Sequence, residues 1–239
     1  MRIPACLVIL LFAFTVSAQT RVTIRSQKTI LVRSGKIVRD FPEKKRASVT
    51  QPVFSGLSPS VLKQLRATLA LKNIFGSTLN EYRSEAWLEE FSYEVHFNQQ
   101  GILDIAYTQS GSGAYPDQQT KHFVIDLKTG RTINAAEVFV TSQSEKLAAL
   151  LDSKLQAEIK QVLSETGDEG KSAYEGKSLK FEVKDLENFS IGPKGVTFLY
   201  DAGFPHVIQA LQPDGQYLLS FADLKPYLRP EGKLGQFIR

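Results

Sequence analysis

The sequence of 239 residues holds one cysteine, one methionine, one tryptophan and three histidines. The cysteine, Cys6, lies inside the first apolar segment, so a chain processed after residue 18 would have none. No disulfide can then stabilise an exported form, and the core alone must do so. About 220 residues suffice for this, because the buried fraction of the surface rises with chain size.

Long hydrophobic runs are also scarce. Residues 1–18 read MRIPACLVILLFAFTVSA, with one positive residue, an apolar run and a small-residue cleavage site. This pattern predicts a secretory signal peptide, because a transmembrane helix needs about 20 apolar residues. An uncleaved anchor is the alternative. No second run of membrane length follows, so we expect a periplasmic or extracellular protein without a transmembrane anchor after cleavage.

Positive charge is concentrated near the N-terminus. Residues 19–50 contain nine Lys and Arg against two acidic residues, whereas residues 51–239 carry a net charge of −4. The basic arm, residues 19–46, suits contact with an anionic envelope surface, or it is the solvated face of a hairpin turning at Ser34-Gly35. A structural subunit docked through this arm is a further reading. Nucleic acid is not expected as a partner, since no nucleic-acid-binding motif is present.

Three segments show the period-two alternation of half-buried strands. They are residues 91–98, 103–108 and 122–127, with their large apolar side chains at odd positions. Gly101 and Lys128-Thr129-Gly130 supply turns. The pattern predicts an antiparallel meander with one buried face and one face in water. Matching the apolar faces pairs Phe97 with Leu103 and places His96 beside Asp104 on the wet face.

The remaining pattern predicts two main helices and a C-terminal hairpin. Ser58-Pro59 begins one helix, and a capping-box spacing at Ser142 begins a longer one ending at Gly167. A hairpin turns at residues 192–195, and Ser220 caps a short helix. The class is therefore α+β. We divide the chain into a signal peptide, the basic arm, an N-terminal half, a C-terminal half and a loose tail: 1–18, 19–46, 47–135, 136–230 and 231–239.

Common catalytic motifs fail in this sequence. The loop SGSGAYP has Pro116 where a dinucleotide-binding loop needs its third glycine, and no nucleophile elbow surrounds Ser112. Trp87, Phe91 and Tyr93 have strand spacing, which favours core packing over sugar stacking. An enzyme is therefore the less favoured reading, with no catalytic residue, metal ligand or cofactor assigned.

The wet face of the meander holds the best candidate binding residues. His96, His122, Asp104 and Asp126 also form a donor set that suits a metal, which leaves a metal-dependent site open as the alternative. The face has several acids and no Lys or Arg, which suits a cationic partner. The candidate residues are Glu94, His96, Asp104, His122 and Asp126, with Gly113 and Tyr115 of the adjoining loop.

Several motifs resemble one family, the extracytoplasmic domain of RsiV-like, lysozyme-sensing anti-sigma factors. The resemblance lies in VTQPVFSGL with its following helix, in FSYEVHFNQQGILDIAYTQSGSGAYPDQQTKHFVIDLKTGRTINAAEVF, and in FSIGPKGVTFLYDAG and LLSFADLKPYL. It covers about Ala47 to Leu228. The same domain of unknown function accompanies some peptidoglycan deacetylases and occurs alone in exported proteins.

Three departures from the family limit what the resemblance implies. Tyr115 stands where the family often has histidine, and only Arg2 precedes the apolar segment, so no sigma-binding region is expected. The Asp/His metal motifs of the deacetylases are absent too. The resemblance implies an exported, non-catalytic module that binds a lysozyme-like protein or a peptidoglycan or envelope component. The alternative is a cell-envelope hydrolase with a site that standard motifs miss.

Overall fold

The computed structural model describes residues 21–113 and 115–239. The predicted signal peptide, residues 1–18, lies outside the described residues. Within the described residues, no helix combines the length and the apolar character needed to span a bilayer.

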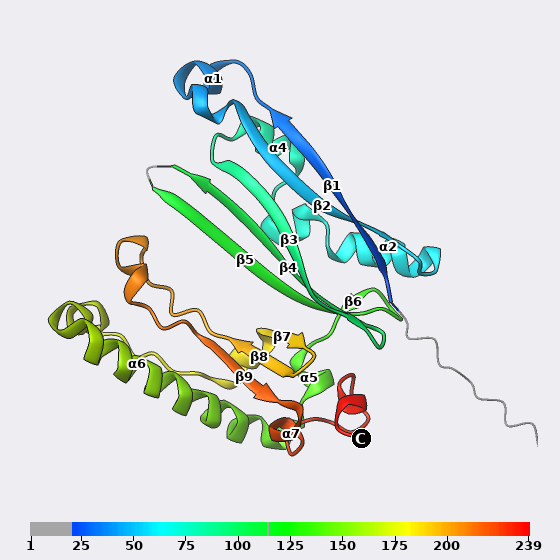
Figure 1. Ribbon diagram of the computed structural model, residues 1–239, viewed down its shortest axis with the longest axis vertical. Coiled ribbons are helices and arrows are strands. Elements are labelled where there is room, and N and C mark those ends of the chain that lie inside the picture. The colour runs from blue at the N-terminus through cyan, green and yellow to red at the C-terminus, as the bar shows by residue number, and fades with distance from the viewer. Residues whose placement is uncertain (1–20, 114) are drawn as a thin grey trace, which may run out of the picture.

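Two β-sheets form the framework of the protein (Figure 1). The larger sheet has its six strands in sequence order: β1 Thr23–Val32, β2 Arg46–Ser55, β3 Leu88–Gln99, β4 Ile102–Ser112, β5 Pro116–Asp126 and β6 Arg131–Thr132. The smaller sheet has three: β7 Phe189–Gly192, β8 Gly195–Leu199 and β9 Gln216–Ser220. Neighbouring strands are antiparallel except β2 and β3, which run parallel across a helical crossover. The α+β class and the β3–β4–β5 meander are confirmed.

The helices lie outside the two sheets (Figure 1). Three of them, in the connection between β2 and β3, cover one face of the larger sheet: α2 Pro59–Thr68, α3 Leu71–Phe75 and α4 Leu79–Ser84. The long helix α6 packs on the smaller sheet. That helix runs from Ser144 to Tyr174. The remaining helices are short: α1 Lys36–Asp40, α5 Ala135–Val138 and α7 Phe221–Leu224. There are also 3₁₀ turns at Pro42–Lys45, Thr141–Gln143, Val183–Glu187, His206–Leu211 and Gly235–Phe237.

Local signals explain where several helices begin and turn. Ser58 caps α2 with Pro59 in the first turn, and Ser220 and Asp223 cap α7 reciprocally, both as the sequence predicts. The helical run is interrupted at Gly167, where the sequence predicts its end, but a second segment follows. Gly167 has non-helical angles, φ 59° and ψ −128°, and helical turns resume beyond it to Tyr174. The glycine therefore separates two helical segments, which meet at a kink.

A β-bulge corrects the predicted register of β3 and β4. Val95 faces Ile105 as expected, but Phe97 faces Asp104 instead of Leu103, and His96 is the extra residue. A bulge shifts every following side chain to the opposite face of its strand. Phe97 consequently joins the core on the other side of the sheet from Phe91.

The described part of the basic arm, residues 21–46, does not form a hairpin by itself. Ile37 and Val38 lie in α1, and β1 pairs with β2 over its whole length, from Thr23–Ser55 to Val32–Arg46. The arm is therefore the edge strand of the larger sheet and the connection that follows it. Exposed positive residues along such an edge discourage pairing with another chain.

The tail from residue 231 is packed, not loose. Leu234 is fully buried, and the ring of Phe237 stacks on Phe221 with centroids 4.5 Å apart. The Nζ of Lys233 lies 2.6 Å from Oδ2 of Asp126 on β5. Apolar residues at the end of the tail thus close the C-terminal core.

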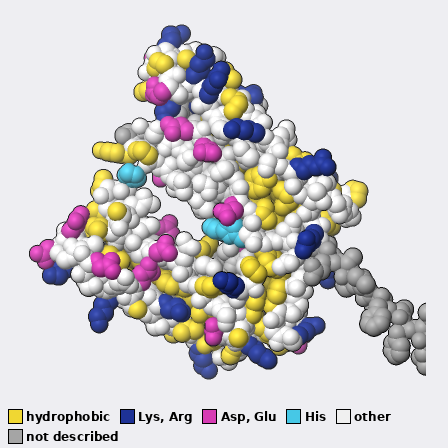
Figure 2. All heavy atoms as spheres, viewed as in Figure 1, with side chains coloured by type: hydrophobic (Ala, Val, Ile, Leu, Met, Phe, Trp, Pro, Cys, Tyr) yellow, Lys and Arg dark blue, Asp and Glu magenta, His cyan; other side chains and the backbone are white. Residues whose placement is uncertain are grey.

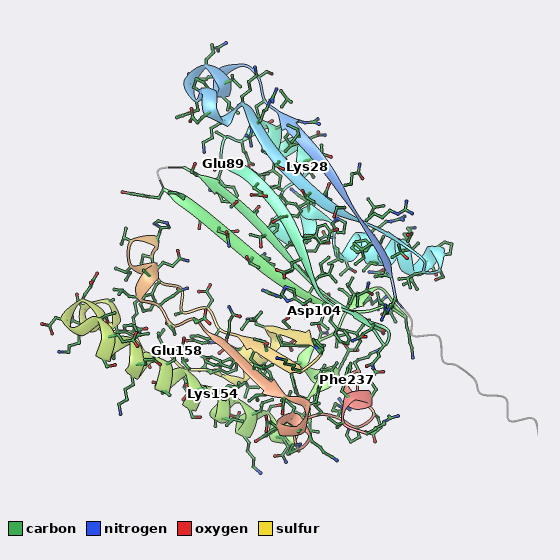
Figure 3. All side chains as sticks on the ribbon, viewed as in Figure 1. Lys28, Glu89, Asp104, Lys154, Glu158 and Phe237 are labelled. Carbon is green, nitrogen blue, oxygen red and sulfur yellow. The ribbon has the colours of Figure 1, made fainter. Side chains whose placement is uncertain are left out.

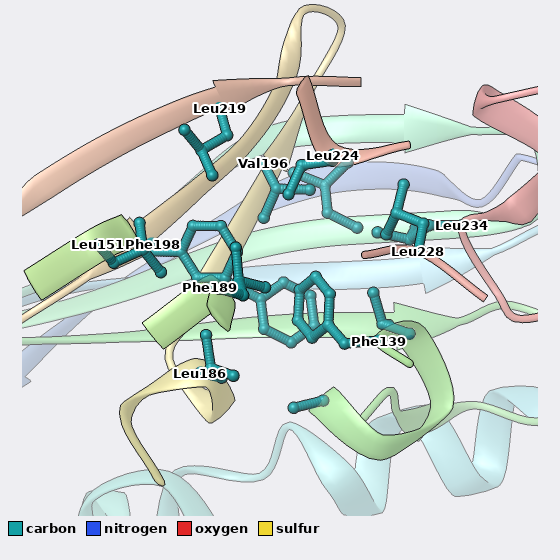
Figure 4. Packing of buried hydrophobic residues seen from close by; sticks show 14 of the residues in the cluster. Phe139, Leu151, Leu186, Phe189, Val196, Phe198, Leu219, Leu224, Leu228 and Leu234 are labelled. Atoms are coloured by element: carbon teal, nitrogen blue, oxygen red, sulfur yellow. The ribbon is translucent and has the colours of Figure 1, made fainter. Parts of the chain in front are cut away.

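That C-terminal core lies between the smaller sheet, α6 and the larger sheet (Figure 4). Phe139 contacts both Phe189 and Phe198, with ring centroids 5.8 and 5.5 Å apart. Phe97, Ile102 and Val124 contribute from the larger sheet. The two sheets are therefore joined by one continuous apolar layer.

The turn after β5 fits directly under α2. Gly130 has φ +74°, and a Cβ there would lie 2.7 Å from the Val61 carbonyl oxygen and 2.8 Å from the Leu65 nitrogen. Gly101 has φ +77° with no atom within 4 Å of such a Cβ. Both Gly→Ala variants place an alanine in the strained left-handed backbone conformation, but Gly130→Ala must also displace α2. We expect Gly130→Ala to lose about 1–3 kcal/mol more than Gly101→Ala in urea unfolding. Equal losses would contradict the close helix contact.

Candidate functional site

The predicted wet face of the meander is covered at one end by the smaller sheet. Asp104 has an exposed fraction of 0% and Asp126 of 6%, so the expectation that both face water is wrong. Strand β7 packs against β3, β4 and β5 at this end. Farther along the same strands the layers diverge, and Glu94 and Thr120 are exposed.

A cleft opens where the layers diverge. Figure 2 shows a hollow between them, with histidine and acidic side chains on its wall. Its inner part, about 500 Å³, is lined by Glu94, His96 and His122 from the meander and by Leu199 and Gln216 from the smaller sheet. An adjoining part of about 580 Å³ extends toward Tyr200, Asp201 and Asp214. The cleft is large enough for a small ligand or an inserted chain segment.

Three polar side chains from neighbouring strands meet at the inner end of the cleft. His96 comes from the bulge in β3, Asp104 from β4 and His122 from β5. Nδ1 of His96 lies 3.8 Å from Oδ1 of Asp104, and the two imidazole centroids are 5.5 Å apart. Figure 3 places Asp104 between the two layers. Because the strands are adjacent and the register is fixed, the sheet itself holds this cluster together.

Burial dominates the electrostatics of Asp104. It raises the pKa of the carboxyl from 3.8 to about 6, and the Ile191 N–H, Ser190 and His96 offset only part of that effect. The Oδ2 atom accepts a hydrogen bond from the Ile191 N–H. Among the described residues, Oδ1 has no hydrogen-bond partner. Asp104 is thus a buried carboxyl with one oxygen committed to β7 and one free.

The surroundings of the second histidine favour its neutral form. Burial is the main reason that the pKa of His122 lies below 6.5, and the neighbouring His96 lowers it further, while Glu94 acts in the opposite sense. Its Nδ1 is buried and meets no hydrogen-bonding group within the described part of the chain. A neutral imidazole with a free nitrogen is a potential metal ligand.

The other predicted site residues lie at different places. Asp126 is outside the cluster and bonds Lys233 and the Lys128 N–H. Glu94 is at the cluster's exposed edge, with Oε2 3.6 Å from Nε2 of His96. Gly113 lies in the β4–β5 turn. Tyr115 of the same turn is 64% exposed and stacks on His206 of the other layer with centroids 5.9 Å apart, so the turn bridges the layers.

The cluster is not arranged for nucleophilic catalysis. Oγ of Ser190 lies 3.2 Å from Nδ1 of His96, and Oδ1 of Asp104 faces the same nitrogen. A Ser–His–Asp triad needs the hydroxyl and the carboxylate on opposite ring nitrogens, so that one orients the base for the other. Ser190 is also buried in β7. This geometry does not support acyl transfer by Ser190.

Comparisons with known proteins rest on structure. No family model matches the chain, and no curated protein matches it. A DUF3298 family structure from Bacteroides fragilis NCTC 9343 superposes with a TM-score of 0.53 at 15% identity, over 89% of this chain and 94% of that one. The chain shares its fold with DUF3298 structures. A second, from Pseudomonas aeruginosa PAO1, gives a TM-score of 0.52 at 13% identity, over 87% of this chain and 94% of that one. These identities establish the fold alone.

Within this DUF3298 fold, the sequence located one wall of the cleft and missed the other. Ser190, Leu199 and Gln216 come from the smaller sheet, where the sequence shows only hairpin and strand patterns. The polar serine in an otherwise apolar four-residue strand, FSIG, is the one local signal that could have drawn attention to β7.

Proposed function

We propose that the chain is an exported, non-catalytic binding module that takes its ligand in the cleft between the two sheets. The observation that carries the proposal is this polar, open cleft, in which serine, histidine and aspartate lack the arrangement of a catalytic triad. The fold supports it, since DUF3298 is the domain found in RsiV-like proteins. The preferred ligand is a cationic, lysozyme-like protein, and a peptidoglycan or envelope component is the other candidate.

Charge in the cleft favours a cationic partner. Glu94, Asp201 and Asp214 are exposed on its walls. Lys121 also borders the cleft, but its Nζ is committed elsewhere, donating to the Ile74 carbonyl at 2.7 Å. Acidic groups without a local counter-charge accelerate encounter with a positive surface and select against negative ones.

Binding to lysozyme and to soluble peptidoglycan fragments tests the proposal by calorimetry at low and moderate salt. We expect lysozyme binding that weakens as salt rises, because exposed charges are screened. The variant Asp201→Asn/Asp214→Asn should weaken it about tenfold. Its control, Glu165→Gln/Asp168→Asn, removes two exposed charges from α6 and should leave it unchanged. The proposal would be overturned if neither ligand binds. If both variants weaken binding equally, the ligand does not bind in the cleft.

A metal-dependent envelope hydrolase is the second candidate, favoured by the convergence of His96, Asp104 and His122. It predicts that the metal-loaded protein releases soluble fragments from peptidoglycan and that Asp104→Asn abolishes the release. A binding module releases none. Chromatography of the soluble fraction after incubation separates the two functions.

A further inference from the structure

The histidine–aspartate cluster has the composition and spacing of a metal site. One ligand atom from each of His96, Asp104 and His122 lies within 4.8 Å of the other two. Two imidazoles and one carboxylate are typical ligands of Zn²⁺ and related transition metals, whereas Ca²⁺ and Mg²⁺ prefer oxygen alone. In a tetrahedral site with ligand bonds of about 2.0–2.1 Å, ligand atoms are about 3.3 Å apart. Small side-chain rotations would therefore bring all three atoms onto one ion.

Two of these side chains have polar atoms that nothing in the fold satisfies. Oδ1 of Asp104 and Nδ1 of His122 are both buried, and neither has a hydrogen-bond partner within residues 21–113 and 115–239. Asp104 itself is completely buried. Leaving such atoms unpaired costs stability, so buried polar groups in native proteins nearly always have a partner. A cation bound between β4 and β5 would be the missing partner for these polar atoms.

Neighbouring groups orient the ligands as they do in known metal sites. The Ile191 N–H holds Oδ2 of Asp104, which leaves Oδ1 directed toward His96. Oε2 of Glu94 lies 3.6 Å from Nε2 of His96. A carboxylate near that nitrogen favours the tautomer with its proton on Nε2, so that Nδ1 offers its lone pair to the Ser190 hydroxyl or, in its place, to a metal. Glu94 is thus a positioning residue for His96.

We propose that His96, Asp104 and His122 bind a divalent transition-metal ion of the Zn²⁺ class at the inner end of the cleft. The three ligands join β3, β4 and β5, and the Ile191 hydrogen bond extends the site to β7, so the ion stabilises the contact between the two sheets. The fourth position faces the cleft and is open to water or to a donor atom from a ligand. This inference does not depend on the proposed function.

The test uses purified full-length chain, stripped of metal with a chelator and free of any histidine tag. Zn²⁺ binding is measured by calorimetry, and Co²⁺ is added as a spectroscopic probe, since its visible absorption reports coordination by nitrogen and oxygen. We expect one ion per chain. At a hundredfold excess of Zn²⁺ over its dissociation constant, the melting temperature should rise by about 5–10 °C.

Four variants assign the ligands. His96→Ala, His122→Ala and Asp104→Asn should each weaken Zn²⁺ binding by at least tenfold and abolish the rise in melting temperature. Glu94→Gln should weaken it by about tenfold while leaving the Co²⁺ spectrum similar, as expected of a positioning residue. The matched control is His206→Ala, because His206 is the remaining histidine and lies outside the cluster.

Circular dichroism and melting of each variant in chelator verify that it is folded, and Asp104→Asn keeps an acceptor for the Ile191 N–H. The proposal is overturned if Zn²⁺ does not bind, or if folded His122→Ala and Asp104→Asn bind it as tightly as the parent chain. Loss of binding in His206→Ala alone would place the ion elsewhere and would likewise overturn it.

Discussion

Arg33→Met is expected to lower the free energy of unfolding by about 3–5 kcal/mol. Arg33 is 2% exposed, and its guanidinium donates to the carbonyls of Lys44, Tyr82 and Leu88 at 2.8, 3.2 and 2.6 Å. Methionine fills a similar volume but leaves these acceptors without a donor, and each unsatisfied buried group costs about 1–3 kcal/mol. Urea unfolding followed by circular dichroism measures the loss.

Arg25→Met is the matched control for Arg33→Met. Arg25 lies on the edge strand β1, which ends one residue before Arg33, and its side chain is exposed, so its replacement should change stability by about 0.5 kcal/mol or less. Similar losses in the two variants would show that the effect is one of charge on the basic arm. A loss under about 1 kcal/mol for Arg33→Met would show that water satisfies the three carbonyls.

Asp104→Asn is expected to remove a pH-dependent loss of stability from the metal-free protein. The folded-state pKa of Asp104 is raised from 3.8 to about 6, so the parent chain loses stability as pH rises through this interval. The full loss corresponds to roughly 3 kcal/mol, since one pKa unit is 1.36 kcal/mol. Asparagine cannot ionise, so the variant should gain roughly 2–3 kcal/mol on the parent between pH 4 and pH 7.

Asp126→Asn should show the opposite pH dependence. Burial opposes ionisation of Asp126, but the Lys233 ammonium, the Lys128 N–H and Thr129 together outweigh it, and the pKa is lowered below 3.8. A carboxyl with a lowered pKa stabilises the fold above its unfolded pKa, and this stabilisation is lost as pH falls through the folded value. The variant should therefore be less stable than the parent at pH 7, with a smaller difference at pH 3. Urea unfolding of both variants at the two pH values, with chelator present, tests these two predictions. They would be contradicted if Asp104→Asn and Asp126→Asn changed the stability at pH 7 in the same direction.

The sequence predicted those elements whose formation depends on local pattern. Alternating apolar residues from Phe91 to Val95 define β3 because one face of that strand packs on its own half of the chain. The Gly192–Gly195 turn and the Ser220 cap are equally local. The same reasoning failed at Ile37 and Val38, since a two-residue apolar pattern does not distinguish a strand from one helical turn.

The other face of the meander could not be predicted because residues about 90 positions away cover it. Asp104 alternates with apolar neighbours, which is typical of a solvated position, yet Ile191 and Ser190 pack over it. The bulge at His96 was equally hidden, since register reasoning assumes one residue opposite one. The sequence therefore identified the candidate residues by their side-chain chemistry. It could not predict that they meet in a buried cluster, because that depends on a long-range contact.

The same bulge has a consequence for how the protein unfolds. Phe91 belongs to the core under α2, α3 and α4, and Phe97, six residues later on β3, belongs to the core under α6. Strand β3 contributes side chains to both cores. If either core unfolds, β3 loses its packing on one face, and the second core is destabilised. The two halves of the chain should therefore denature together in one cooperative transition, despite having separate hydrophobic interiors.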